Sequence, residues 1–437
     1  MSTATVRRIR WYDPESDGAS TPVAWPTASL IVATLFLNFA FMNHVRLWLF
    51  CPLPLFALLA GAVALLVTAL FFMGPALATH AAGRPLFLVI ADSLGSIPAF
   101  GLRLCSVLYL VLWIATLIAV PIWLWSSRFP GRQVSPAKVV IFAAVLLAFL
   151  FVTGRQSLRT EAKLALFTNK LAFAILIAAL IRVHQGWPAA LGGDWASGGR
   201  SWGSEVWAGL SELAFYVAPL GLVAANFGRG SHGRRQVVAT GLMGVALPLF
   251  ATLLLVGVIG AATFASPFYQ PSLEPNVAMA LWSHAAGSAL PGRMMIAAIT
   301  VFGVVRFGVG ALAEAAGIPA PGIRWGWALL VCFLVAIAWL SLHPYAPASM
   351  TALILAARCL AVTGAVVTVD FVIGRRRVAQ VRRVDWVGLI ALLAGLATPL
   401  YVSDWVLRSY FVGFLVCSCG RIAQRMPIVK RFDTARH

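Results

Sequence analysis

The sequence contains little charge. Only 11% of its 437 residues are charged and 14 of them are acidic, whereas 61% are hydrophobic. A soluble domain would expose far more charge than this. Runs of about 20 apolar residues, each long enough to cross a bilayer as a helix, recur along almost the whole chain. The composition therefore excludes a soluble protein and predicts an all-α polytopic membrane protein.

The sequence also lacks the usual signatures of catalysis and of metal binding. Its six cysteines do not have the spacing of a zinc site or of a disulfide framework. Its seven histidines form no HExxH motif, and neither a hydrolase triad nor a nucleotide-binding loop is recognisable. We therefore expect no enzymatic activity, no cofactor and no bound metal.

The apolar runs predict twelve transmembrane helices. An N-terminal tail (1–25) and a C-terminal tail (425–437) lie outside them. We place the spans at residues 26–48, 53–76, 98–126, 136–153, 163–184, 207–227, 235–264, 292–316, 325–342, 347–373, 386–402 and 405–424.

The net charge of +19 would suggest a nucleic-acid partner if the basic residues were clustered on one domain. Instead, most lie in alternate loops and in the two tails. The opposite loops hold only Arg128, Arg132 and Arg200. The positive-inside rule then places both termini in the cytoplasm of a cell inner (plasma) membrane. The basic charge therefore reflects topology, and we expect a bilayer and not a nucleic acid around the chain.

Two spans contain residues that a simple membrane anchor does not need. The first includes NFAFMNHVRLW, with Asn38, Asn43 and His44 close together, and the sixth includes Pro219 and Gly221 in FYVAPLGLVAANFG. Broken helices five spans apart are typical of a five-plus-five inverted repeat with a binding site at the membrane midplane. The alternative is a pair of kinked packing helices. Between the second and third spans, THAAGRPLFLVIADSLGSIP predicts a short helix lying against the membrane.

Three stretches together resemble the nucleobase–cation symporter family of cytosine, purine, hydantoin and allantoin permeases, in the amino acid–polyamine–organocation superfamily. GAVVTVDFVIGRRRVAQVRRVDWVGLIALLAG is similar to the end of span 10, with Asp370 before the arginines and Asp385-Trp386 opening span 11. AFYVAPLGLVAANFGRGSHGRRQVVATGLMGVALPLF resembles spans 6 and 7, although Asn226 replaces the usual aspartate of their turn. ADSLG to LYLVLWIATL resembles the start of span 3.

The resemblance covers roughly residues 25 to 425 and implies the LeuT-type fold. In that fold residues 26–184 form the first repeat (spans 1–5) and 207–373 the second (spans 6–10), with spans 11 and 12 at 386–424. It further implies alternating access around a planar, uncharged heterocycle held between spans 1, 3, 6 and 8. The expected function is therefore that of a permease.

The resemblance also implies a set of substrate contacts. Trp113 would stack on the heterocycle, and Tyr216, or Val217 after a one-residue shift, would cover its other face. Asn43 and His44 would read the polar edge of the ring. The remaining positions that the resemblance assigns to the substrate are Leu117 and Phe307. For each of these the alternative is an ordinary packing or hydrogen-bonding role.

The coupling site departs from that of the sodium-dependent relatives. Those proteins supply hydroxyls from span 8, where this chain has VFGVVRFGVG, with Arg306 in the middle and no hydroxyl. We interpret Arg306 as a permanent sodium mimic, Asn38 as part of the same region, and Lys170 in span 5 as a proton carrier, because a buried lysine can release its proton. The alternative for Lys170 is snorkelling to the membrane surface. Coupling is then to protons or absent. The runner-up functions are an amino-acid or small-anion transporter of the same fold and a transport-dead sensor.

Overall fold

A computed structural model describes residues 24–37, 53–126, 158–188, 202–264, 347–374, 384–398 and 405–424, together with single positions between them. The regular structure in these ranges is helical. The helices are α1 (Trp25–Phe36), α2 (Leu53–Thr68), η2 (Ala69–Met73), α3 (Gly74–Ala82), α4 (Leu86–Leu94), α5 (Ser96–Ser126), α7 (Leu158–Arg182), η3 (His184–Gly186), α9 (Trp202–Ala224), η4 (Ala225–Gly230), α10 (Arg234–Gly241), η5 (Leu242–Ala246), α11 (Leu247–Phe264), α16 (Pro347–Val369), η8 (Asp370–Gly374), α17 (Trp386–Leu396) and α18 (Trp405–Ala423).

Within the described ranges, six helical runs are long and apolar enough to cross a membrane. They overlap the second, third, fifth, seventh, tenth and twelfth predicted spans, and two of them join an α-helix, a π-helical turn and a second α-helix into one run. The short helix expected between the second and third spans is α4. These observations confirm a multi-pass, all-helical membrane protein.

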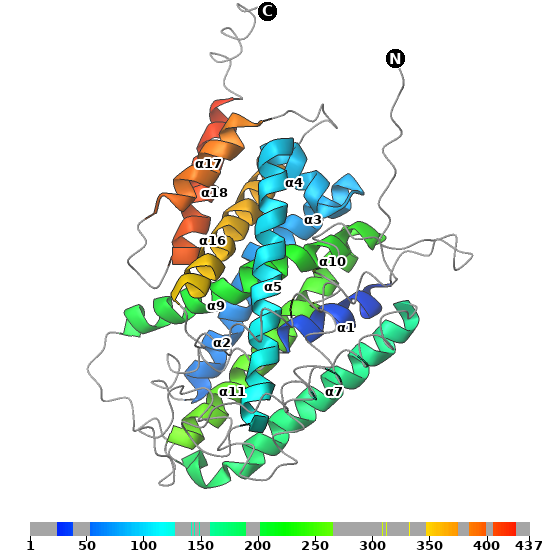
Figure 1. The fold of residues 1–437 in the computed structure, drawn as a ribbon, viewed down its shortest axis with the longest axis vertical. Helices are drawn as coiled ribbons and strands as arrows, with labels where there is room; N and C mark the ends of the chain where they lie inside the picture. Colours follow the sequence, from blue (N-terminus) through cyan, green and yellow to red (C-terminus); the bar gives the residue numbers. More distant parts are fainter. Residues whose placement is uncertain are drawn as a thin grey trace, which may run out of the picture.

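Helix α16 lies inside the bundle and is largely buried, between α5, α9, α17 and α18 (Figure 1). Gly395 of α17 and Gly413 of α18 both face Val362 of α16 so closely that a β-carbon on either glycine would collide with the valine side chain. Because lipid tails are as apolar as a leucine side chain, such close packing of small residues drives the association of helices in a bilayer. Spans 10, 11 and 12 therefore form one tightly packed unit.

A π-helical turn, η2, interrupts the second span. Such a turn inserts one extra residue and disturbs the regular ladder of backbone hydrogen bonds. The Leu70 carbonyl of this turn accepts a hydrogen bond of 3.0 Å from the Tyr410 hydroxyl of α18, whose ring packs edge-on against Phe71. On the other side, Gly221 of α9 lets the Phe71 carbonyl approach to 3.1 Å from where a β-carbon would stand.

The sixth span decides between the two interpretations of its sequence. Pro219 and Gly221 indicated either a broken helix or a packing helix, and α9 is not broken there, because it continues as an α-helix to Ala224 before it tightens into the 3₁₀ turn η4. Gly221 serves close packing against η2, as described above. Pro219 has no N–H to donate to the carbonyl four residues earlier in α9. A side chain of another span donates to that carbonyl instead, so the backbone stays helical there.

Candidate functional site

Trp113 lies at the centre of the candidate site, on α5. Its side chain is only 2% exposed, and its indole Nε1 is buried with no hydrogen-bond partner among the described residues. The indole ring packs against span 8, because a β-carbon added to Gly308 would stand 3.0 Å from Trp113 Cζ3. Buried indole N–H groups ordinarily find an acceptor. Among the described residues this donor therefore stays available to a ligand.

One turn before Trp113, Tyr109 connects α5 to the proline region of α9. Its hydroxyl donates a hydrogen bond of 3.3 Å to the Phe215 carbonyl. Phe215 lies four residues before Pro219, so its carbonyl is the one that an ordinary residue at 219 would have bonded. Tyr109 therefore replaces the missing helical donor and fixes α5 against α9.

Aromatic rings continue the wall along α9. The Phe215 ring lies edge-on to Tyr109, with centroids 6.4 Å apart, and edge-on to Tyr216, with centroids 4.7 Å apart. Tyr216 is partly buried and Val217 is fully buried. Tyr109, Phe215 and Tyr216 thus form one uncharged aromatic cluster of spans 3 and 6, and Tyr109 lies one helical turn before Trp113 on α5.

The structure places only some of the predicted site residues. Leu117 lies in α5, but its side chain is outside the described part. Five further residues fall outside the described ranges. They are Asn38, Asn43, His44, Arg306 and Phe307. The last two immediately precede Gly308 in sequence, and Gly308 is the residue that contacts Trp113.

Lys170 is exposed on α7, whereas a proton carrier in the core would be buried. Its neighbour Asn169 is the residue that contacts span 1, donating from Nδ2 to the Leu30 carbonyl at 3.0 Å. The exposed position is the one expected for snorkelling. A coupling role for Lys170 stays a prediction.

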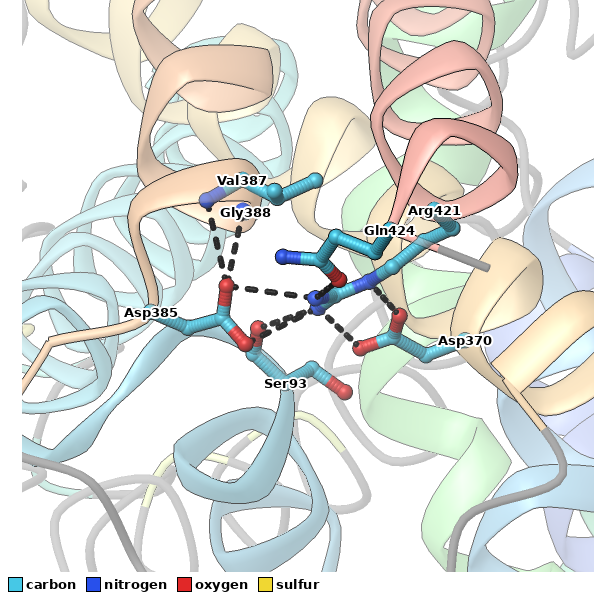
Figure 2. Close-up of polar contacts among 7 residues, drawn as sticks. All are labelled: Ser93, Asp370, Asp385, Val387, Gly388, Arg421 and Gln424. Atoms are coloured by element: carbon cyan, nitrogen blue, oxygen red, sulfur yellow. Dashed lines mark hydrogen bonds and ion pairs between the residues drawn. The ribbon is translucent and has the colours of Figure 1, made fainter. Parts of the chain in front are cut away.

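A buried charge cluster lies at the end of the bundle where spans 10, 11 and 12 meet α4 (Figure 2). The Arg421 guanidinium of α18 lies between two carboxylates. Its Nε is 2.6 Å from Asp370 Oδ1 and its Nη2 is 3.0 Å from Asp385 Oδ2. All three side chains are at most 8% exposed. Asp385 also caps α17, accepting from the amides of Val387 and Gly388. The cluster therefore fastens three spans at one point.

A second buried arginine, Arg358, lies within α16. Its guanidinium donates to the Ser409 hydroxyl at 2.9 Å and to the Leu396 and Thr398 carbonyls, both at 2.9 Å. Those carbonyls belong to the end of α17, where the helix dipole is negative. Arg358 thus caps α17 inside the bundle. In the described part of the chain it is bonded to oxygens of neutral groups.

Only part of these two networks was predicted from the sequence. Asp370 and Asp385 were singled out as motif residues, but Arg358 and Arg421 were not. An arginine in an apolar run is itself a signal of a buried partner. Among the described residues no group of three or more histidine, cysteine, aspartate or glutamate side chains could hold a metal ion.

No family model matches the chain, and no curated protein matches its sequence. Solved structures match over almost its whole length. Mhp1 in an inward-facing conformation is 14% identical, with a TM-score of 0.64, and the match covers 97% of this chain and 96% of Mhp1. Mhp1 in a closed conformation with bromovinylhydantoin bound, described as a nucleobase-cation-symport-1 family transporter, is 14% identical with a TM-score of 0.61, covering 98% and 97%.

A Na⁺-coupled sialic acid symporter, in a substrate-bound outward-open state, is 11% identical, with a TM-score of 0.62, and the match covers 92% of this chain and 90% of that one. Identities this low establish shape and not substrate. The chain is similar in fold to these transporters, and it has the all-helical LeuT-type architecture that its sequence predicted.

Proposed function

We propose that the protein is a secondary active transporter that carries a small planar nitrogen heterocycle, such as cytosine or a purine, by alternating access. The observation that carries this proposal is the buried Trp113 indole of span 3, whose six-membered ring lies against Gly308 of span 8 and whose N–H has no partner among the described residues. An indole face stacks on a flat ring, and its N–H can donate to a ring nitrogen or carbonyl. The likeness in fold to Mhp1 with bromovinylhydantoin bound supports the same class of ligand.

The uncharged aromatic cluster that adjoins Trp113 along α5 supports a neutral ligand. It consists of Tyr109, one helical turn before Trp113, with Phe215 and Tyr216 of α9, and the uncharged Val217 follows them. A carboxylate buried among them would need a compensating charge. The alternative, an amino-acid or small-anion transporter, is favoured by His44, Arg46 and Arg306, which would pair with an anion. The fold does not choose between the two, because a sialic acid symporter shares it.

A binding panel distinguishes these candidates. Purified protein is mixed separately with cytosine, hypoxanthine, allantoin and amino acids, and its thermal unfolding is recorded. Under our proposal a heterocycle raises the unfolding temperature, and Trp113→Ala abolishes that shift while the variant still unfolds cooperatively. Stabilisation by amino acids alone would favour the runner-up.

Coupling to protons, or no coupling, follows from Arg306. A fixed guanidinium in span 8 would occupy the charge of a sodium ion and repel one. Uptake of the stabilising heterocycle into proteoliposomes should therefore persist when choline replaces sodium at constant pH. Loss of uptake in choline would refute sodium independence. Arg306→Ser should weaken folding or transport and introduce sensitivity to sodium, and a variant that transports like the parent would remove the sodium-mimic hypothesis.

A transport-dead sensor is the remaining candidate, because VFGVVRFGVG, the part of span 8 where sodium-dependent relatives have hydroxyls, has none. Counterflow tests this. Proteoliposomes preloaded with unlabelled heterocycle should accumulate labelled heterocycle if the protein is a transporter. Tight binding without counterflow would indicate a sensor. We also propose an inner-membrane location with both termini cytoplasmic, which protease accessibility of terminal tags in spheroplasts would check.

A further inference from the structure

Helix α4 is joined to its neighbours by two glycine corners. Gly83 and Gly95, the glycines with positive φ in the described part of the chain, have φ of 59° and 98° and lie just outside its two ends. Glycine adopts such angles without the steric cost that a side chain brings. The chain therefore turns sharply before and after this nine-residue rod. The position of α4 is set by whatever holds its two ends.

The N-terminal end is held by the turn that follows span 6. The Leu86 amide, which has no partner within the helix because it lies in the first turn, donates to Asn226 Oδ1 at 2.9 Å. Asn226 belongs to η4, which packs tightly against α3. The Thr79 hydroxyl is 2.8 Å from the Ala225 carbonyl, and a β-carbon on Gly228 would collide with the Ala76 carbonyl. The ends of spans 2 and 6 therefore form one body, and Asn226 belongs to it.

The C-terminal end is held by the charge cluster of spans 10 to 12 (Figure 2). The Asp385 amide donates to the Leu94 carbonyl at 2.9 Å, and Arg421 Nη2 lies 3.3 Å from the Ser93 carbonyl. Gly388 leaves no room for a side chain beside that same carbonyl. The apolar face of α4 is also buried and packs on α5, α16 and α17 as well as on α3.

The two ends are held with unequal strength. At the N-terminus the polar contact is a neutral amide-to-amide hydrogen bond. At the C-terminus the Ser93 carbonyl accepts from the buried Arg421 guanidinium, and the Leu94 carbonyl accepts from the Asp385 amide. The Asp385 carboxylate is itself bonded to Arg421. Hydrogen bonds to charged groups are roughly twice as strong as neutral ones. If α4 is released at one end, the contact between Leu86 and Asn226 therefore breaks before the contacts of Ser93 and Leu94.

We propose that α4 stays with spans 10 to 12 and that the Leu86–Asn226 hydrogen bond is a latch, opened in each transport cycle, between the N-terminal end of α4 and the turn that follows span 6. The inference rests on the alternating-access function proposed above. It also explains why an amide is useful at position 226. An aspartate there would add a charge-assisted bond at the positive end of a helix and hold the latch closed.

Hydrogen exchange of the full-length protein in nanodiscs tests the latch without any substrate. Single-amide fragmentation follows Leu86 at one end of α4 and Asp385 at the other. In the parent protein Leu86 should exchange faster than Asp385. Asn226→Ala should accelerate Leu86 by roughly tenfold and leave Asp385 unchanged, whereas Asn226→Asp should slow Leu86 by about fivefold.

Asp370→Asn is the matched variant at the other end. It removes one of the two charges paired with Arg421 and keeps the Asp385 cap of α17. It should therefore accelerate exchange of the Asp385 amide and leave exchange of the Leu86 amide unchanged. Faster exchange at Asp385 than at Leu86 in the parent, or equal acceleration of both amides by Asn226→Ala, would overturn the proposal. Failure of the binding panel and of uptake, with this exchange pattern intact, would instead count against the transporter function and leave the unequal latch standing.

Discussion

The Tyr109 hydroxyl donates to the Phe215 carbonyl at 3.3 Å, and Phe215 lies four residues before Pro219. Removing this donor should leave a buried carbonyl unsatisfied, which costs about 1–3 kcal/mol. Tyr109→Phe should lower the stability of the protein by that amount. Thermal or denaturant unfolding of purified protein measures it.

Pro219→Ala supplies the control for Tyr109→Phe. An alanine at 219 restores the helical N–H that reaches the Phe215 carbonyl. The double variant should therefore lose less stability than Tyr109→Phe alone. If the two effects simply add, the tyrosine and the proline are not compensating for each other.

Arg421→Met should be strongly destabilising. The substitution leaves the Asp370 and Asp385 carboxylates facing each other in a buried site, and breaking a buried ion pair costs about 3–5 kcal/mol. Arg408→Met on the same helix is the control, since Arg408 is exposed and exposed ion pairs contribute about 0–1 kcal/mol. Equal unfolding temperatures for the two variants would show that the cluster does not stabilise the protein.

Gly228→Ala should separate η4 from α3. The added β-carbon would meet the backbone carbonyl of Ala76, which cannot rotate away as a side chain does. Overpacking of this kind costs about 1–3 kcal/mol. Gly233→Ala, a few residues later, has nothing within 4 Å of its β-carbon and should be close to neutral. Comparable losses at both positions would contradict the tight contact.

Trp113→Phe should keep an aromatic face but remove the indole N–H. If the N–H donates to the heterocycle, affinity should fall by roughly five- to tenfold, the loss expected for one hydrogen bond. Trp113→Ala should lose a further factor because stacking contributes about 1–3 kcal/mol per ring. Isothermal titration with the heterocycle that stabilises the parent gives both values. Unchanged affinity in Trp113→Ala would place the ligand elsewhere.

The sequence was sufficient where the signal is local. The Asp385-Trp386 pair was predicted to open span 11, and Asp385 does cap the helix that begins at Trp386. Capping chemistry depends on residues three positions apart, so one sequence reveals it. Hydrophobic runs likewise located the spans that the structure describes.

The sequence was insufficient where partners are distant. Asp370 and Arg421 are 51 positions apart, and no periodicity in either helix indicates that they meet. Whether span 6 breaks at Pro219 stayed open in the sequence for the same reason. A proline predicts a free carbonyl, but only the packing of α5 reveals a tyrosine that satisfies it.

The π-helical turn η2 fixes how α3 is rotated about its axis. One residue of an α-helix corresponds to about 100° of rotation, because there are about 3.6 residues per turn. If the same residues were wound as a plain α-helix, with none deleted, the whole of α3 would therefore rotate by about that angle. Gly74, which has no space for a side chain against Thr368 of α16, would no longer face that helix. The register between spans 2 and 10 thus depends on one inserted residue. A sequence aligned without a one-residue gap here, from a relative that lacks the turn, would be shifted by one at every later position of span 2.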